Sequence, residues 1–209
     1  MNRQSNNANG FSMLELLLAT AIFIVVGGAT FSVLFSSQLR YQSESGLTNA
    51  FQQANIVMDQ IVRDVHSAGF PPRSAVKSTT ATASPQYYAV PFPQSSGIPG
   101  DDDLILEADQ GSGVQWIRYS LVDKTLKRVV VNKLPGSDPV VATDPTNEAP
   151  FLDNVVNGSI PIFSYRPDSS NIREVNICLM VQSSQPDPQT QQFRTITLTG
   201  RAVAFNANY

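Results

Sequence analysis

The sequence has one cysteine, one histidine and one tryptophan in 209 residues. A lone cysteine, Cys178, excludes a disulfide bond within the chain, although an exported domain would be free to form one. A lone histidine, His66, is the only residue around which a Ser-His-Asp triad could be built. The sequence also has no glycine-rich phosphate loop, no HExxH motif and no paired-cysteine metal motif. We therefore expect neither an enzyme nor a bound cofactor.

Charge is also scarce, since Asp, Glu, Lys and Arg make up 15% of the residues and the formal net charge is −3. A chain with this net charge lacks the excess of basic residues that is typical of nucleic-acid-binding proteins. Its length fits one long helix followed by one domain of ordinary size.

The segment from Phe11 to Leu39 is almost entirely apolar or uncharged, and its only charged residue is Glu15. Roughly 20 apolar residues span the hydrocarbon core of a bilayer, and Leu16 to Phe35 supplies that length. The run is too long for the apolar region of a secretory signal peptide. It predicts a membrane-spanning helix, in which a carboxylate such as Glu15 is a functional candidate by default.

The residues around Glu15 carry a resemblance to a known family. The string GFSMLEL (residues 10–16), after a short polar leader and before a long uncharged helix, resembles the class III signal of type IV pilins and type II secretion pseudopilins. The resemblance implies cleavage between Gly10 and Phe11 by a prepilin peptidase. It also implies N-methylation of Phe11 and a role for Glu15 in subunit docking.

The same resemblance implies a domain organisation and a location. Residues 1–10 are expected to be the prepilin leader, residues 11–39 the transmembrane half of the N-terminal helix, and residues 40–209 an exported pilin-like domain. The chain would cross the bacterial inner membrane once and later enter a pilus or pseudopilus, where its partners are other pilins. Because Arg3 and Arg40 flank the run almost evenly, the outward orientation of the domain rests on the resemblance.

Three departures from the usual pilin pattern narrow the assignment. No proline lies near Ser32, no disulfide can close the C-terminal region, and the domain is large. These features favour a minor subunit, most like a PilW-type minor pilin that helps initiate or cap a fibre, with a J-type minor pseudopilin as the alternative. A membrane-tethered adhesin or ligand-binding module is a third possibility, which an exposed aromatic patch around Tyr87 to Phe92 would favour. Gly27-Gly28 is either a weak point of the helix or a site of close helix packing.

The helix is expected to continue beyond the membrane to about His66. An apolar stripe recurs at helical spacing, with Asp64 assigned to the polar faces; its members are Leu47, Ala50, Phe51, Ala54, Val57, Met58, Ile61, Val62 and Val65. Gly69, followed by two prolines, ends the helix. His66 then lies in the last turn, where it interacts favourably with the helix dipole.

From Asp101 onward the pattern changes to that of strands, at Leu104–Ala108, Gly113–Val122, Thr125–Lys133, Arg173–Gln182 and Phe193–Phe205. The predicted class is α+β, with the apolar stripe of the helix packed on an antiparallel β-sheet. The core face of the first three strands is expected to hold Leu104, Leu106, Val114, Trp116 or Ile117, Tyr119, Leu121, Val129 and Val131. Pro161 indicates an edge position or an irregular segment.

Two further features are assigned structural roles. Asp101 to Asp103 does not match the spacing of a calcium-binding loop and is interpreted as a solvated turn before a strand, so no metal site is predicted. Cys178 lies in a predicted buried strand and is interpreted as an inert core thiol.

Overall fold

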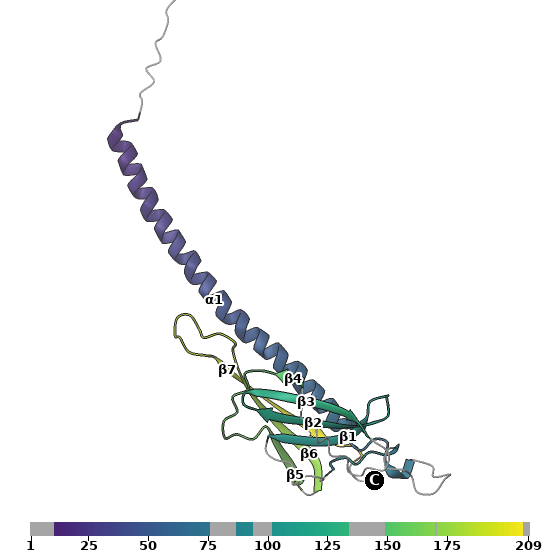
Figure 1. The fold of residues 1–209 in the computed structure, drawn as a ribbon. Coiled ribbons are helices and arrows are strands. Elements are labelled where there is room, and N and C mark those ends of the chain that lie inside the picture. Colours follow the sequence, from purple (N-terminus) through teal and green to yellow (C-terminus); the bar gives the residue numbers. More distant parts are fainter. Residues whose placement is uncertain (1–10, 76–86, 94–101, 134–148, 170, 207–209) are drawn as a thin grey trace, which may run out of the picture.

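The computed structural model describes residues 11–75, 87–93, 102–133, 149–169 and 171–206. Helix α1 (Met13–Ser67) projects far beyond the strands, and residues past Gly69 form the rest of the domain (Figure 1). The other elements are η1 (Arg73–Ala75), β1 (Asp103–Asp109), β2 (Val114–Val122), β3 (Thr125–Asn132), β4 (Ala149–Leu152), β5 (Phe163–Asp168), β6 (Asn171–Gln182) and β7 (Thr195–Val203). The predicted α+β class and the long N-terminal helix are confirmed.

Both ends of α1 have a local chemical cause. The hydroxyl of Ser12 accepts a hydrogen bond from the first turn and Glu15 accepts one in return, which is a capping box. At the other end Gly69 has a φ of +78°, and a Cβ there would lie 2.5 Å from the ring of Pro91. Only glycine fits such a position without strain, so the predicted stop is confirmed. The helix runs unbroken through Gly27-Gly28.

The strands form two antiparallel sheets, and the single sheet predicted is in fact divided. The first has the order β1-β2-β3-β4 and the second the order β5-β6-β7. Asp123, with a φ of 57°, forms the tight turn between β2 and β3. Pro161 lies outside the strands, just before β5, which is an edge strand as predicted. The hydroxyl of Tyr165 donates to the carbonyl of Asp103 at 2.7 Å and joins β5 to β1.

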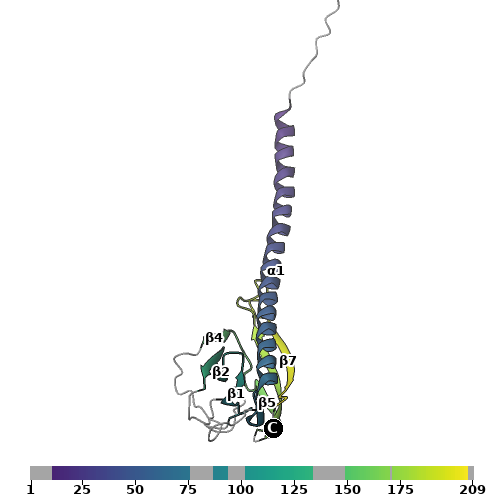
Figure 2. The same cartoon turned by 90° about the vertical axis from the view of Figure 1, so that its right-hand side faces the viewer.

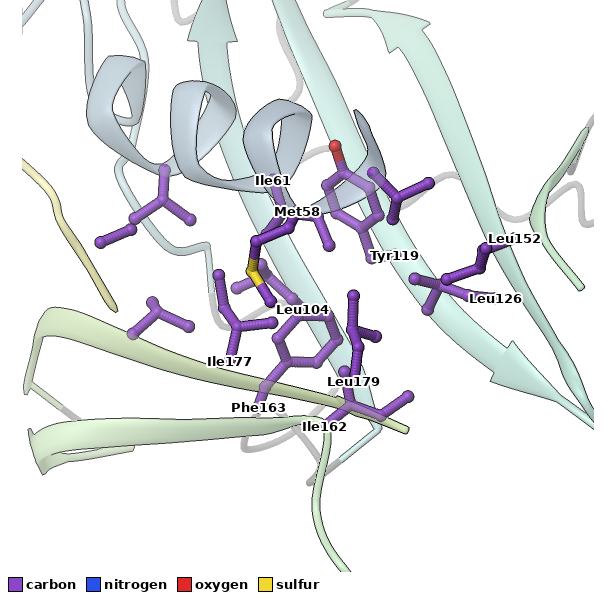
Figure 3. Packing of buried hydrophobic residues seen from close by; sticks show 14 of the residues in the cluster. Met58, Ile61, Leu104, Tyr119, Leu126, Leu152, Ile162, Phe163, Ile177 and Leu179 are labelled. Carbon is purple, nitrogen blue, oxygen red and sulfur yellow. The ribbon is translucent and has the colours of Figure 1, made fainter. Parts of the chain in front are cut away.

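The domain half of α1 lies across both sheets and packs mainly against β7 and β6 (Figure 2). Its predicted stripe is confirmed, because six members are buried in the main core, at Ala50, Ala54, Val57, Met58, Ile61 and Val65. Phe51 is the exception, since half of its surface is exposed. Figure 3 shows Met58 and Ile61 among side chains from both sheets, with Tyr119 beside them and Phe163 and Leu179 below. One core therefore holds the two sheets and the helix together.

Two predictions about side-chain direction are wrong. Val129 and Val131 pack with Trp116 and Ile105 in a separate cluster on the opposite face of the first sheet. Successive side chains of a strand point to opposite faces, and Leu126 points into the main core, so residues 3 and 5 positions further along β3 point away from it. Cys178 is half-buried and alternates with Ile177 and Leu179, both of which enter the core. It therefore lies on the outer face of β6 instead of in the core.

Candidate functional site

The first half of α1 has no partner within the described part of the chain. Every residue from Phe11 to Phe35 is exposed, and this half of the helix is long and apolar enough to cross a membrane. Its exposed side chains include large apolar groups on all sides of the helix, such as Leu17, Leu18 and Phe23. A helix that is apolar all round must be covered by lipid or by other helices.

Glu15 begins this surface. Its Oε2 accepts a hydrogen bond from the backbone N–H of Ser12 at 3.0 Å, while the Ser12 hydroxyl accepts one from the N–H of Leu14 at 3.3 Å. A carboxylate in the first turn also interacts favourably with the helix dipole. Phe11, the predicted new terminus, is 86% exposed directly before this cap. Gly10 lies outside the described residues, so the cleavage site, the methylation of Phe11 and the docking role of Glu15 stay predictions.

The charges at the two ends of the apolar run match the thickness of a bilayer. Leu16 to Phe35 measures about 30 Å at 1.5 Å per residue, which is about the thickness of the hydrocarbon core. Glu15 lies at one end of this length, and Arg40 lies one to two helical turns past the other end. The geometry places both charged groups at the level of lipid headgroups when the helix is in a membrane.

The domain half of α1 is joined to the first sheet through a buried carboxylate, Asp64, which is 1% exposed. Its Oδ2 accepts hydrogen bonds from the Tyr119 hydroxyl and from Nη2 of Arg128, the latter at 2.9 Å. Its Oδ1 accepts from the side-chain amides of Gln60 and Gln110, each at 2.7 Å. Burial, followed by the neighbouring charge of Asp64, raises the pKa of Tyr119 far above its usual value.

The sequence pattern missed this group. Asp64 was assigned to the polar faces because it is charged, yet it lies beside Val65 and one turn from Ile61 at the margin of the buried stripe. Its partners Tyr119 and Arg128 come from two strands that are distant in the sequence. No spacing rule connects such residues before the fold is known.

A second buried ion pair fastens the segment after the helix. Nζ of Lys133 lies 2.7 Å from Oε2 of Glu107, and both side chains are fully buried. The same Nζ donates to the carbonyl of Tyr88, and the same oxygen accepts from the N–H of Val90. Tyr88 is accordingly buried, and Phe92 is half-buried against the main core. Of Tyr87, Tyr88 and Phe92, the aromatics in the segment where an exposed patch would favour an adhesin, only Tyr87 is exposed.

The remaining candidate residues have structural roles. Asp103 forms two hydrogen bonds to the guanidinium of Arg118, and Asp102 accepts from the N–H of Ile162. Asp101 lies outside the described residues. Within the described ranges no three His, Cys, Asp or Glu side chains come together as metal ligands. His66 lies in the last turn of α1, as predicted, and its ring packs 4.8 Å from that of Phe205.

Comparison with known proteins agrees with this arrangement. The chain is 24% identical over 154 residues to the pilin-like protein PilA3 of Thermus thermophilus, and the match covers 70% of this chain. It covers 64% of that protein, a little under two thirds of its length. No family model and no solved structure matches the chain. The long apolar helix on antiparallel sheets is a pilin-like arrangement, and the chain is similar over most of its length to a pilin-like protein.

Proposed function

We propose that the chain is a minor structural subunit of a type IV pilus, which helps initiate or cap the fibre. One observation carries the proposal. Half of α1 is apolar on every side and exposed throughout, while the other half is already covered by the chain's own sheets. A helix of this kind is stable first in a lipid bilayer and then among the helices of neighbouring subunits.

The proposal requires the leader to be removed. Cleavage between Gly10 and Phe11 by a prepilin peptidase would leave Phe11 as the N-terminal residue, and its amine would be N-methylated. Before cleavage the chain is held in the inner membrane with the domain exported. Phe11 and Ser12 are both exposed, and this exposure supports access of the peptidase to the proposed site.

Glu15 is proposed to dock the helix in the fibre. A carboxylate among packed apolar helices needs a positive partner, because an unpaired buried charge is expensive. The terminal amine of an adjacent subunit supplies that charge. The capping hydrogen bond occupies Oε2 and leaves Oε1 for this partner.

Intact-mass analysis of the protein tests the first step. In a host with a prepilin peptidase, membranes and sheared surface fibres should both contain residues 11–209 with one added methyl group. A strain without the peptidase is the control and should retain residues 1–209 in the membrane only. Retention of the leader in the competent host would contradict the proposal, and recovery of mature protein only in a secretion complex would favour a pseudopilus instead.

A further inference from the structure

The loop between β6 and β7, residues 183–194, extends beyond the sheets along α1 towards its apolar half. Both views of the molecule show this loop beside the helix (Figures 1 and 2). It brings the side chains of Asp187, Gln189 and Arg194 next to Leu39 and Arg40, where the apolar run of α1 stops. Among the described loops of the domain, this one reaches furthest along α1 towards the apolar half (Figure 1).

The loop is fixed in this position by Asp187. Oδ2 of Asp187 accepts a hydrogen bond from the Ser43 hydroxyl at 3.1 Å, which ties the loop to α1. Oδ1 accepts from the backbone N–H groups of Gln189 and Thr190, and these hydrogen bonds hold the pKa of Asp187 below its usual value. Nε of Arg194 lies 3.6 Å from the same carboxylate. The loop is thus built around an ionised group.

A polar cavity of about 240 Å³ lies between the loop and the helix. Its charged lining consists of two cations, Arg40 and Arg194, and two carboxylates, Glu44 and Asp187. Each element contributes one charge of each sign, so the cavity is dipolar and has no net charge. Within the described part of the chain neither Arg40 nor Glu44 forms an ion pair, and both are exposed.

The height of the cavity follows from the length of the apolar run. With Phe35 at the edge of the hydrocarbon core, Arg40 lies one to two helical turns further out, in the headgroup layer. Tyr41, next to it, is 73% exposed, and tyrosine is enriched at this level of membrane proteins. A ligand that reaches the cavity from the membrane is therefore a lipid headgroup.

We propose that this cavity, named here the loop–helix cavity, binds the headgroup of a zwitterionic phospholipid that carries a primary ammonium, such as phosphatidylethanolamine. The phosphate contacts Arg40 and Arg194, and the ammonium donates its N–H groups to Glu44 and Asp187. The dipolar lining fits such a headgroup better than an anionic one, because an anionic headgroup would offer no positive partner to the exposed carboxylate of Glu44. The inference rests on the membrane stage of the proposed function.

Binding of defined lipids to the full chain in detergent tests the assignment, with native mass spectrometry as the readout. Phosphatidylethanolamine should bind about tenfold more tightly than phosphatidylcholine of the same acyl chains, because methylation of the ammonium removes its hydrogen-bond donors. The double variant Arg40→Gln/Arg194→Gln should lose this preference. The matched control is Arg201→Gln, which removes a cation that is paired with Glu174 on β6 and should leave the preference intact.

Each other result contradicts the proposal. Equal affinity for the two lipids, or an unchanged preference in the double variant, would exclude the cavity as the headgroup site. Tighter binding of an anionic lipid such as phosphatidylglycerol would show a simple cationic patch. Loss of fibre incorporation in the double variant without any lipid preference in the wild type would assign the cavity to a protein partner. Flotation of the wild type with liposomes separates these outcomes from failure of the membrane stage, which would show as no flotation at all.

Discussion

The two halves of α1 share one unbroken hydrogen-bonded backbone and differ in what covers their side chains. From Phe11 to Phe35 every residue is exposed, whereas between Ala50 and Val65 six residues of the stripe are buried in the domain core, mainly against β7 and β6. The first half has one charged residue, and the second half is polar on the faces that its stripe leaves free. The backbone geometry of the helix therefore does not indicate whether each half requires lipid or the domain core around it. That information lies in the distribution of apolar side chains around the helix.

The two halves of α1 meet at the point where the helix first contacts the rest of the domain. Arg40 marks the end of the uncharged run, and a few residues later Ser43 makes the first side-chain hydrogen bond to the domain. The apolar half therefore depends on partners outside the chain, and the domain half depends on partners within it. The following predictions test this division, beginning with the largest expected effect.

Removal of residues 1–39 should move the protein completely from the membrane fraction to solution. The remaining fragment keeps the covered half of α1 and both sheets, so it should be monomeric and unfold in one cooperative transition. Size-exclusion chromatography and near-UV circular dichroism check this. Aggregation, or helical signal without fixed tertiary packing, would show that the domain half also needs outside partners.

Asp64→Ala should lower the free energy of unfolding by about 2–4 kcal/mol, because it leaves the half-buried guanidinium of Arg128 and the buried Tyr119 hydroxyl without their shared acceptor. Chemical denaturation of the fragment 40–209 measures the change. Asp59→Ala removes an exposed carboxylate from the same helix and should change stability by less than about 0.5 kcal/mol. Equal effects of the two substitutions would mean that the buried network does not hold the helix to the sheet.

Gly69→Ala should destabilise the domain by about 2 kcal/mol, since it adds both left-handed strain and a contact with Pro91. Gly158→Ala separates the two causes. Gly158 also has a positive φ, of +60°, but a Cβ there would meet no atom within 4 Å. The Gly158→Ala control should therefore lower the free energy of unfolding by about 1 kcal/mol, from backbone strain alone. Thermal unfolding of the two variants compares the costs, and a smaller loss for Gly69→Ala would contradict the account of how α1 ends.

Alkaline pH should weaken the attachment of α1 through Tyr119. The native pKa of this phenol is raised above that of the unfolded chain, so stabilisation is complete below about pH 10 and is lost as the unfolded state releases its proton above that value. The loss approaches about 1.4 kcal/mol per pH unit. Tyr119→Phe, compared by denaturation between pH 9 and 11, should lack this part of the pH dependence. If the stability of the wild type and of Tyr119→Phe fell in parallel over this pH range, the pKa of the Tyr119 phenol would not be raised by folding.

Local patterns in the sequence predicted the features that depend on neighbouring residues. They predicted the extent of α1, its stop at Gly69, its buried stripe and most of the strands. The division into two sheets was missed, because sheet membership is decided by pairing between distant strands. Asp64 was missed for a related reason, since its partners lie on β2 and β3. Cys178 was placed on the wrong face because an apolar run does not show the alternation of a strand clearly.

The sequence predicted the apolar surface of the first half of α1, but it did not predict the contacts that the residues of the candidate site make. The uncharged run and Glu15 were evident from composition, and the structure adds the capping hydrogen bond to Ser12. The partner of Glu15 could not be predicted from contacts within the chain, because the proposed partner belongs to another subunit. The loop–helix cavity was missed because its residues come from positions about 150 apart in the sequence, so each charge on its own resembles an ordinary surface residue.

The incorporation of Glu15 variants into fibres tests the central claim most directly. The Glu15→Gln and Glu15→Ala variants should insert into the membrane as well as the wild type or better, because each substitution removes a charge from the apolar half of α1. Their amount in sheared fibres, relative to membranes, should fall roughly tenfold or more through loss of the charge pair. Asp59→Asn, an exposed substitution in the domain half, should be incorporated normally. Wild-type incorporation of both Glu15 variants would contradict the claim that the apolar half of α1 docks through this carboxylate.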